Sequence, residues 1–192
     1  MQADAIVIGA SAGGLRAIGL ILSSLPASFP LPILVAQHIH PDMNSLSVTL
    51  MQEKCQIQVQ EGIDKEPINA GVAYLAPPNY HLLVECDRTL SLSVDERVNF
   101  ARPSIDVLFE SASEVFESRL IGIVLTGANK DGAEGLKFIK ANGGTAIVQD
   151  PNTAEYDAMP KAALEATSVD FVLPLEKIAP ALLTVVGQRR QA

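Results

Sequence analysis

Five short, continuous apolar runs recur along the chain, and each lies next to a segment with the spacing of an amphipathic helix. The runs cover residues 5–8, 32–36, 120–125, 145–148 and 170–173. Strands that are buried on both faces of a parallel sheet have this composition. The alternation therefore predicts an α/β fold, with a doubly wound, mostly parallel sheet and helices on both faces. Apolar residues at helical spacing mark five helices: Leu15, Ile18, Ile21 and Leu22; Leu46, Leu50 and Met51; Ile105, Leu108, Phe109 and Ala112; Leu136 and Ile139; Ile178, Leu182 and Val185.

The stretch from Gln56 to Asn99 has a different pattern. Ile57 and Val59 alternate with polar residues, and the segment from residue 81 to 94 resembles two strands joined by a turn at 86–89. We therefore predict an antiparallel hairpin, and we interpret the whole stretch as an insertion against the main sheet. A chain of 192 residues is expected to form one domain, residues 1–192.

Composition excludes several classes of protein. Hydrophobic residues make up 48% of the chain, but no long apolar run and no basic leader occur, so we expect a cytoplasmic protein without membrane insertion. Cys55 and Cys86 lack CxxC spacing, and with only three histidines a disulfide framework or zinc site is not expected. Both thiols are predicted to be packing residues. The net charge of −8 argues against nonspecific nucleic-acid binding.

Ser11 lies where the first strand meets the first helix, within Gly9-Ala10-Ser11-Ala12-Gly13-Gly14. A tight turn there would hold its hydroxyl beside the free backbone N–H groups of the helix N-terminus, which suits acyl-transfer chemistry. The alternative is that Ser11 only caps the helix. A glycine-rich turn can also bind phosphate, which would suit a nucleotide-binding module. However, the dinucleotide fingerprint requires glycine at position 11 and a P-loop requires Gly-Lys-Ser/Thr, and neither is present here.

Two further reactive side chains follow other predicted strands. His38 comes after the run at 32–36, and Asp131 lies in the loop after the run at 120–125. Ligands of an open α/β sheet bind beyond the carboxyl ends of the strands, so Ser11, His38 and Asp131 are expected at one rim. There they would act as nucleophile, general base and orienting carboxylate.

Alternatives to this assignment remain open. His40 or His81 could replace His38, and Asp131 could cap the helix that follows it, because Glu134 stands three residues later. Glu134, Asp150 and Asp157 are other carboxylates near this rim, but helix periodicity or loop solvation accounts for them.

Five blocks of residues have a specific pattern: 8–14 (Ile-Gly-Ala-Ser-Ala-Gly-Gly), Gln37-His38, 102–109 (Arg-Pro-Ser-Ile-Asp-Val-Leu-Phe), Leu125-Thr126-Gly127 with 131–135 (Asp-Gly-Ala-Glu-Gly), and Met159-Pro160. Together they resemble the catalytic domain of chemotaxis protein-glutamate methylesterases, the CheB family, over nearly the whole chain. The resemblance implies a serine hydrolase that demethylates glutamyl methyl esters on the cytoplasmic helices of methyl-accepting chemoreceptors and releases methanol. Many relatives also deamidate receptor glutamines. The family's catalytic roles fall on Ser11, His38 and Asp131, and no metal or organic cofactor is implied.

Two further assignments concern the substrate. Backbone N–H groups of Ala12 and Ala128 are expected to receive the oxyanion that forms on the ester carbonyl. Arg102 is a candidate for binding an acidic receptor segment, because a guanidinium recognises carboxylates through paired hydrogen bonds. The alternative for Arg102 is a salt bridge that tethers the start of the helix after Pro103.

The chain departs from the family pattern in three ways. Ala128 and Asn129 replace a usual methionine and glycine, and Ala12 replaces a frequent threonine. The altered 128–130 loop makes a noncatalytic receptor-binding or scaffold protein the alternative function. Typical members also carry an N-terminal receiver domain, whereas this chain begins with the catalytic strand. We therefore expect constitutive activity, control by a separate response-regulator receiver protein, or an excised piece of a longer protein.

Overall fold

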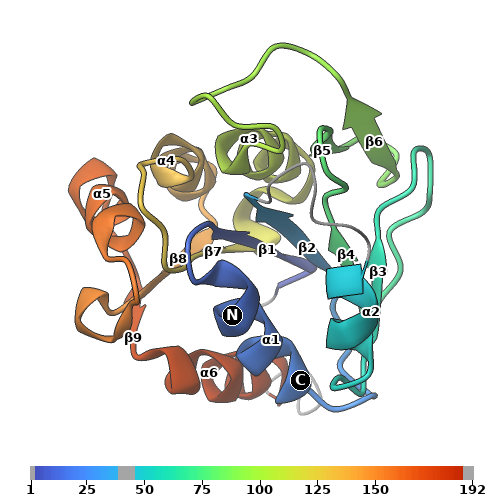
Figure 1. Ribbon diagram of the computed structural model, residues 1–192, viewed down its shortest axis with the longest axis horizontal. Helices are drawn as coiled ribbons and strands as arrows, with labels where there is room; N and C mark the ends of the chain where they lie inside the picture. Colours follow the sequence, from blue (N-terminus) through green and yellow to red (C-terminus); the bar gives the residue numbers. More distant parts are fainter. Residues whose placement is uncertain (1–2, 39–45, 188–192) are drawn as a thin grey trace.

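The computed structural model describes residues 3–38 and 46–187 and contains a seven-stranded, fully parallel sheet (Figure 1). The predicted α/β class is confirmed. The strand order is β3 (Gln58–Glu61), β4 (Val72–Leu75), β2 (Ile33–Gln37), β1 (Ala5–Ala10), β7 (Leu120–Val124), β8 (Thr145–Gln149) and β9 (Phe171–Leu173).

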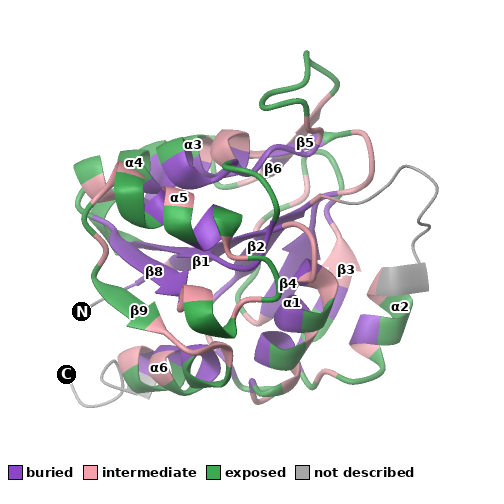
Figure 2. Cartoon of the chain, turned by 60° about the vertical axis from the view of Figure 1, so that its left-hand side comes forward, coloured by how far each residue is buried: buried purple, intermediate pink, exposed green. Residues whose placement is uncertain are grey.

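Helices cover both faces of this sheet. Side chains alternate along β1, so that Ile6 and Ile8 enter one core while Val7 enters the other. Figure 2 shows the buried strands between the two helical layers. One face is covered by α1 (Gly14–Ser23), α2 (Leu46–Gln52) and α6 (Leu175–Gly187), and the other by α3 (Ile105–Phe116), α4 (Ala133–Ala141) and α5 (Ala158–Ala166). Two single turns, η1 (Glu117–Arg119) and η2 (Pro151–Thr153), complete the helical segments in the described part of the chain.

The interpretation of residues 56–99 as one insertion is wrong in part. The predicted hairpin is present as β5 (His81–Val84) and β6 (Leu90–Ser93), which pair antiparallel in a separate two-stranded sheet. However, β3 and β4 belong to the main sheet. The buried run of β4 was grouped with the neighbouring hairpin, and β3 is an edge strand whose polar residues alternate with Val59.

Two smaller differences from the sequence prediction also occur. Helix α5 was not among the predicted helices; its Pro160 stands in the first turn, where a missing N–H costs little. Cys55 is half-buried against the core as expected, but Cys86 is exposed in the hairpin turn and is not a packing residue. No helix within residues 3–38 and 46–187 combines the length and the apolar character needed to traverse a bilayer.

The middle of the sheet positions the candidate site. The chain moves outward from β1 through β2 to one edge and then returns to place β7 on the other side of β1. The loops that follow β1 and β7 therefore lead to helices on opposite faces, α1 and α4, and diverge at the carboxyl end of the sheet. Such a point of divergence is where open α/β sheets bind ligands. Ser11 and Asp131 lie in these two loops.

Candidate active site

The turn after β1 presents Ser11 without using it as a helix cap. The N-cap of α1 is Gly13, in the left-handed conformation at φ 76°, and no side chain caps this helix end. The amide of Ser11 instead donates to Thr126 O in the β7–α4 loop at 3.0 Å, which continues the pairing of β1 and β7 beyond the strands. The alternative that Ser11 only caps the helix is therefore wrong, and its hydroxyl faces His38.

Ser11, His38 and Asp131 form a continuous hydrogen-bonded chain. Ser11 Oγ lies 3.2 Å from Nδ1 of His38, and Nε2 of His38 lies 2.7 Å from Oδ2 of Asp131. The structure thus brings together the three side chains selected from the sequence. Ionised Asp131 can only accept, so Nε2 carries the proton of the neutral imidazole and Nδ1 offers its lone pair to the serine hydroxyl.

Asp131 is a buried carboxylate with an unusual number of donors. Besides His38, it accepts hydrogen bonds from the Ile105 amide at 2.7 Å, Ser104 Oγ at 2.9 Å and Asn99 Nδ2 at 2.9 Å. Burial alone would raise the pKa of Asp131, but the bonds from His38, Ile105 and Asn99 outweigh it and lower that pKa to about 2. Asp131 is therefore ionised throughout the physiological pH range.

Asp131 and Asp106 cap each other's helices. Neither α3 nor α4 has a side-chain cap from its own N-cap residue. The Asp131 carboxylate accepts the Ile105 and Asp106 amides at the start of α3. In return, Oδ1 of Asp106 accepts the Gly132 and Gly135 amides at the start of α4, at 2.9 and 2.7 Å. Asp131 thus caps a helix, as one alternative had it, but the helix is α3 and not the one that follows it.

Asp106 is a second acid directly behind the first. Burial and the charge of Asp131 raise the pKa of Asp106 to about 6, although the Gly135 amide and Asn99 donate to its carboxylate. Asn99 Nδ2 bridges the pair, at 2.7 Å from Asp106 Oδ2 and 2.9 Å from Asp131 Oδ1. Asp106 is therefore the carboxylate of this site that titrates nearest to neutral pH.

We expect Asp106→Asn to remove a pH-dependent part of the stability. The folded pKa of about 6 lies above the ordinary value of 3.8, so the folded state holds a proton that the unfolded chain has lost. The contribution of Asp106 to stability should fall as pH rises through this window. Urea midpoints of both proteins at about pH 4.5 and about pH 7 measure how much stability each protein loses between the two pH values. An equal loss in the parent and in Asp106→Asn would contradict the assignment.

Gln37 and Thr126 fix the strand ends relative to one another. Gln37 is buried, and its Nε2 donates to Ser11 O at 2.8 Å and to His38 O at 2.9 Å. Thr126 Oγ1 donates to Ala12 O at 3.0 Å, and the Tyr156 amide donates to the same hydroxyl oxygen at 2.9 Å. The backbones that carry Ser11 and His38 are therefore held by side chains and not by strand pairing alone.

Gly127 passes close to the serine. A β-carbon at this position would clash with Sδ of Met159 and lie 2.9 Å from Cβ of Ser11. The Gly127 amide donates to Tyr156 O, and its carbonyl accepts from the Met159 amide, both at 3.0 Å. The loop therefore requires glycine here because Met159 and Ser11 flank it.

The amides of Ala12 and Ala128 are available for an incoming group. Neither forms a hydrogen bond with any residue in ranges 3–38 and 46–187. Both residues belong to the two loops that Ser11 and Thr126 link. Their assignment as oxyanion donors stays a prediction, and this availability is compatible with it.

The other candidate residues have structural partners. His81 is buried in β5, where its Nδ1 accepts from the Ser104 amide and its Nε2 lies 3.0 Å from Glu96 O, so it does not replace His38. His40 lies outside the described residues. Glu134 pairs with Lys137, Asp157 pairs with Lys161, and Asp150 accepts from the Asn152 amide. No group of three or more potential metal-ligating side chains occurs in the described ranges.

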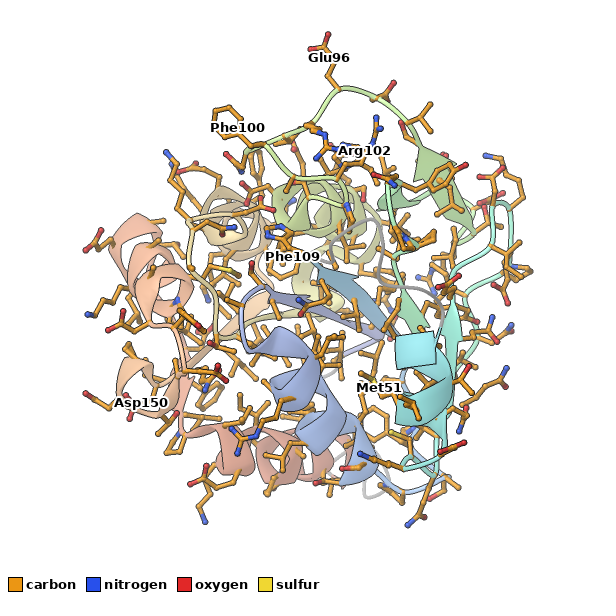
Figure 3. The ribbon with its side chains drawn as sticks, in the orientation of Figure 1. Met51, Glu96, Phe100, Arg102, Phe109 and Asp150 are labelled. Carbon is orange, nitrogen blue, oxygen red and sulfur yellow. The ribbon has the colours of Figure 1, made fainter. Side chains whose placement is uncertain are left out.

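Arg102 holds a loop in place. Its Nη1 donates to the carbonyls of Val94 and Asp95, at 2.5 and 2.9 Å, and it forms no ion pair among the described residues. Figure 3 shows Arg102 beneath this loop, while Glu96 and Phe100 point outward from it. Backbone hydrogen bonds therefore take the place of the salt bridge that was the alternative for Arg102, and contact with an acidic substrate stays a prediction.

Several polar residues of the site were not selected from the sequence. Gln37, Ser104 and Asp106 stand inside the blocks that carry the family resemblance, so their position in those blocks was an available signal. Asn99 was not recognisable, because it reaches Asp131 from a loop that follows the separate hairpin. The sequence marks Asn129 only as a departure from the family pattern.

Comparison with known proteins identifies the family. A family model described as CheB methylesterase matches residues 6–182. The chain belongs to the CheB methylesterase family. A relative from Leptospira interrogans is 58% identical over 93% of both chains. The protein-glutamate methylesterase/protein-glutamine glutaminase of Clostridium acetobutylicum is 36% identical over 97% of this chain and 54% of its own length.

The fold agrees with a solved member of the CheB family. The crystal structure of the Thermotoga maritima CheB methylesterase catalytic domain superimposes with a TM-score of 0.91 and 33% sequence identity. The match covers 96% of this chain and all of that domain. The seven-stranded sheet and its helices are therefore those of a CheB catalytic domain.

Proposed function

We propose that this chain is a protein-glutamate methylesterase that hydrolyses glutamyl methyl esters on the cytoplasmic helices of chemoreceptors, in chemotaxis adaptation. The observation that carries the proposal is the contact of Ser11 with His38 and of His38 with Asp131, in a chain of the CheB family. Relatives from Clostridium acetobutylicum and Thermotoga maritima carry the same activity in their names. The receptor substrate and the cytoplasmic location belong to the proposal.

Ser11 is the nucleophile and His38 the base of the proposed reaction. Oγ of Ser11 attacks the ester carbonyl carbon while its proton passes to Nδ1 of His38, 3.2 Å away in the resting site. The tetrahedral intermediate collapses as His38 returns that proton to the departing methoxy oxygen, and methanol leaves. Water then attacks the acyl-serine with the same base, which regenerates Ser11 and releases the glutamate side chain.

Asp131 and the loop amides complete the mechanism. Asp131 keeps the proton of His38 on Nε2 and stabilises the imidazolium that forms when Ser11 attacks. The Ala12 and Ala128 amides donate to the carbonyl oxygen as it becomes negative, and losing one such donor typically costs about 3 kcal/mol of barrier. No metal or organic cofactor takes part in the proposed chemistry.

Glutamine deamidation uses the same groups with a different leaving group. Relatives are named protein-glutamine glutaminases as well as methylesterases. His38 would then protonate a departing amine, and ammonia would replace methanol as the product. Amides are poorer acyl donors than esters, so the esterase rate should be the larger of the two.

Methanol release from methylated chemoreceptor fragments tests the proposal directly. Purified protein should release methanol from fragments that carry glutamyl methyl esters, and the release should stop when the esters are exhausted. If it releases none while it binds the fragments tightly, the chain is a noncatalytic receptor-binding protein. A separate response-regulator receiver protein, added with a phosphodonor, tests whether activity depends on such a partner.

Gly127→Ala should impair both stability and methanol release. The added methyl group must displace Met159 or Ser11, so we expect a loss of about 1–3 kcal/mol in the free energy of unfolding. A displaced nucleophile should also lower kcat, by roughly 10²-fold for a shift near 1 Å. Urea unfolding and methanol assays measure the two effects.

Gly19→Ala is the matched control for this substitution. A β-carbon at Gly19, within α1, has no neighbour inside 4 Å. Alanine should therefore leave methanol release unchanged and increase stability by about 0.5–1 kcal/mol, because glycine is costly in a helix. Equal behaviour of the two alanine variants would contradict the steric argument.

A further inference from the structure

Asn129 contacts both ends of the His38–Asp131 pair, although the family pattern has glycine at this position. Its Nδ2 lies 3.0 Å from Nδ1 of His38. Its Oδ1 accepts a hydrogen bond from the Asp131 amide at 3.0 Å. A glycine offers no side chain for either contact, so this chain has a polar group in the site that the usual family loop lacks.

The Asp131 amide determines which way the Asn129 side chain points. A backbone N–H can only donate, so the oxygen of the side-chain amide must face Asp131. The NH₂ group must then face His38. Because NH₂ donates and does not accept, the contact is a hydrogen bond only when Nδ1 of His38 is unprotonated.

We propose that Asn129 is a positioning residue that holds His38 in the neutral tautomer with Nδ1 unprotonated, ready to receive the Ser11 proton. The inference rests on the proposed esterase function for its catalytic consequence, but not for the tautomer itself. Asp131 accepts from Nε2 on one side of the ring, and Asn129 donates to Nδ1 on the other. The two contacts specify the same tautomer from both sides.

The same contact opposes protonation of the base. Once Nδ1 carries a proton, the NH₂ group of Asn129 faces another donor and must turn away. Ser11 and Asn129 also share the single lone pair of Nδ1, at 3.2 and 3.0 Å. Asn129 therefore favours neutral His38 between turnovers, and its NH₂ group turns away from Nδ1 when the serine proton arrives.

The carboxylates near the ring act in the opposite direction. Asp131 contacts Nε2, and Asp106 lies behind Asp131 on α3, so both carboxylates favour the imidazolium. Lys130 is next to Asn129 and lines a surface hollow with Asp106, Glu134 and Glu165. Asn129 differs from these charged groups because it contacts Nδ1 of His38 directly, and its NH₂ group can form a hydrogen bond there only when Nδ1 accepts.

Asn129→Asp isolates the contact with His38 from the contact with Asp131. One carboxylate oxygen still accepts from the Asp131 amide, so the turn is preserved, while the other oxygen now presents an acceptor to Nδ1. In ¹⁵N-histidine NMR of the protein without substrate, Nδ1 of His38 should give an unprotonated signal in the parent and a protonated one in Asn129→Asp near pH 7. The acidic limb of the pH profile of kcat/KM for methanol release should move up by roughly one pH unit. At pH values below the new limb, kcat/KM should therefore be about tenfold lower than in the parent.

Two more variants distinguish this role from a structural one. Lys130→Gln changes the net charge by the same amount one residue away, without touching His38, and should leave the NMR signal unchanged. Asn129→Ala loses both contacts. If Asn129 only supports the turn, Asn129→Asp will match the parent in NMR and pH profile while Asn129→Ala loses activity at every pH; that result overturns the proposal. Because the NMR readout needs no substrate, it stands even if the esterase function fails.

Discussion

Replacing Ser11 with alanine is expected to lower methanol release by about 10⁵-fold or more, because loss of the nucleophile in a serine hydrolase removes covalent catalysis altogether. The Ser11 hydroxyl contacts Nδ1 of His38, and it caps no helix. Its removal should therefore change the free energy of unfolding by no more than about 0.5 kcal/mol. Methanol release and urea unfolding of the same preparation measure both quantities.

Ser23→Ala serves as the matched control. Ser23 lies in α1, and its hydroxyl donates to the Leu20 carbonyl of the same helix at 3.2 Å, away from the candidate site. This variant should retain full methanol release. Turnover by Ser11→Ala at more than a small fraction of the parent rate would remove Ser11 from the mechanism.

A fluorophosphonate probe addresses the alternative of a noncatalytic scaffold. Such probes react with a serine whose proton can pass to a neighbouring base, and not with an ordinary surface hydroxyl. The parent protein should be labelled at Ser11, and Ser11→Ala should not be labelled. An unlabelled parent protein, together with intact binding to receptor fragments, would favour the scaffold function.

The sequence was sufficient for five of the seven strands of the main sheet and for the three side chains that the structure brings together. Buried parallel strands leave recognisable apolar runs, and residues that follow them meet at one rim, so Ser11, His38 and Asp131 could be selected without coordinates. The rule needs only the carboxyl ends of the strands that precede these side chains, which are β1, β2 and β7. It therefore applied even though β3 and β4 were misassigned.

The polar network around these side chains could not be predicted in the same way. Asp106 and Asp131 cap each other's helices across 25 residues of sequence, and local capping patterns describe only contacts within one helix start. Asn99 joins the network from an irregular loop in which it adopts a positive φ of 52°. Such contacts depend on how α3 packs against α4, which no local pattern of residues records.

Asp131 caps α3 and contacts His38, and its replacement should reveal the capping role together with the proposed catalytic one. An amide in place of the carboxylate must turn an NH₂ group toward either the Ile105 amide and His38 or the Asp106 amide and Asn99. In either orientation the NH₂ group of the asparagine faces N–H groups, with which it cannot form a hydrogen bond. Asp131→Asn should therefore destabilise the protein by about 2–4 kcal/mol through the unsatisfied donors at the start of α3.

The same substitution should reduce kcat by roughly 10⁴-fold, because His38 loses the acceptor that keeps its proton on Nε2. His38→Ala separates the two effects: it removes the base but leaves the helix-capping bonds of Asp131 in place. We therefore expect His38→Ala to be at least as inactive in methanol release, yet clearly more stable in urea than Asp131→Asn. If the two variants were equally stable, the carboxylate would not be the cap of α3. If Asp131→Asn retained most of its activity while folded, His38 would not need Asp131 to act as a base, and the site would operate as a serine–histidine dyad.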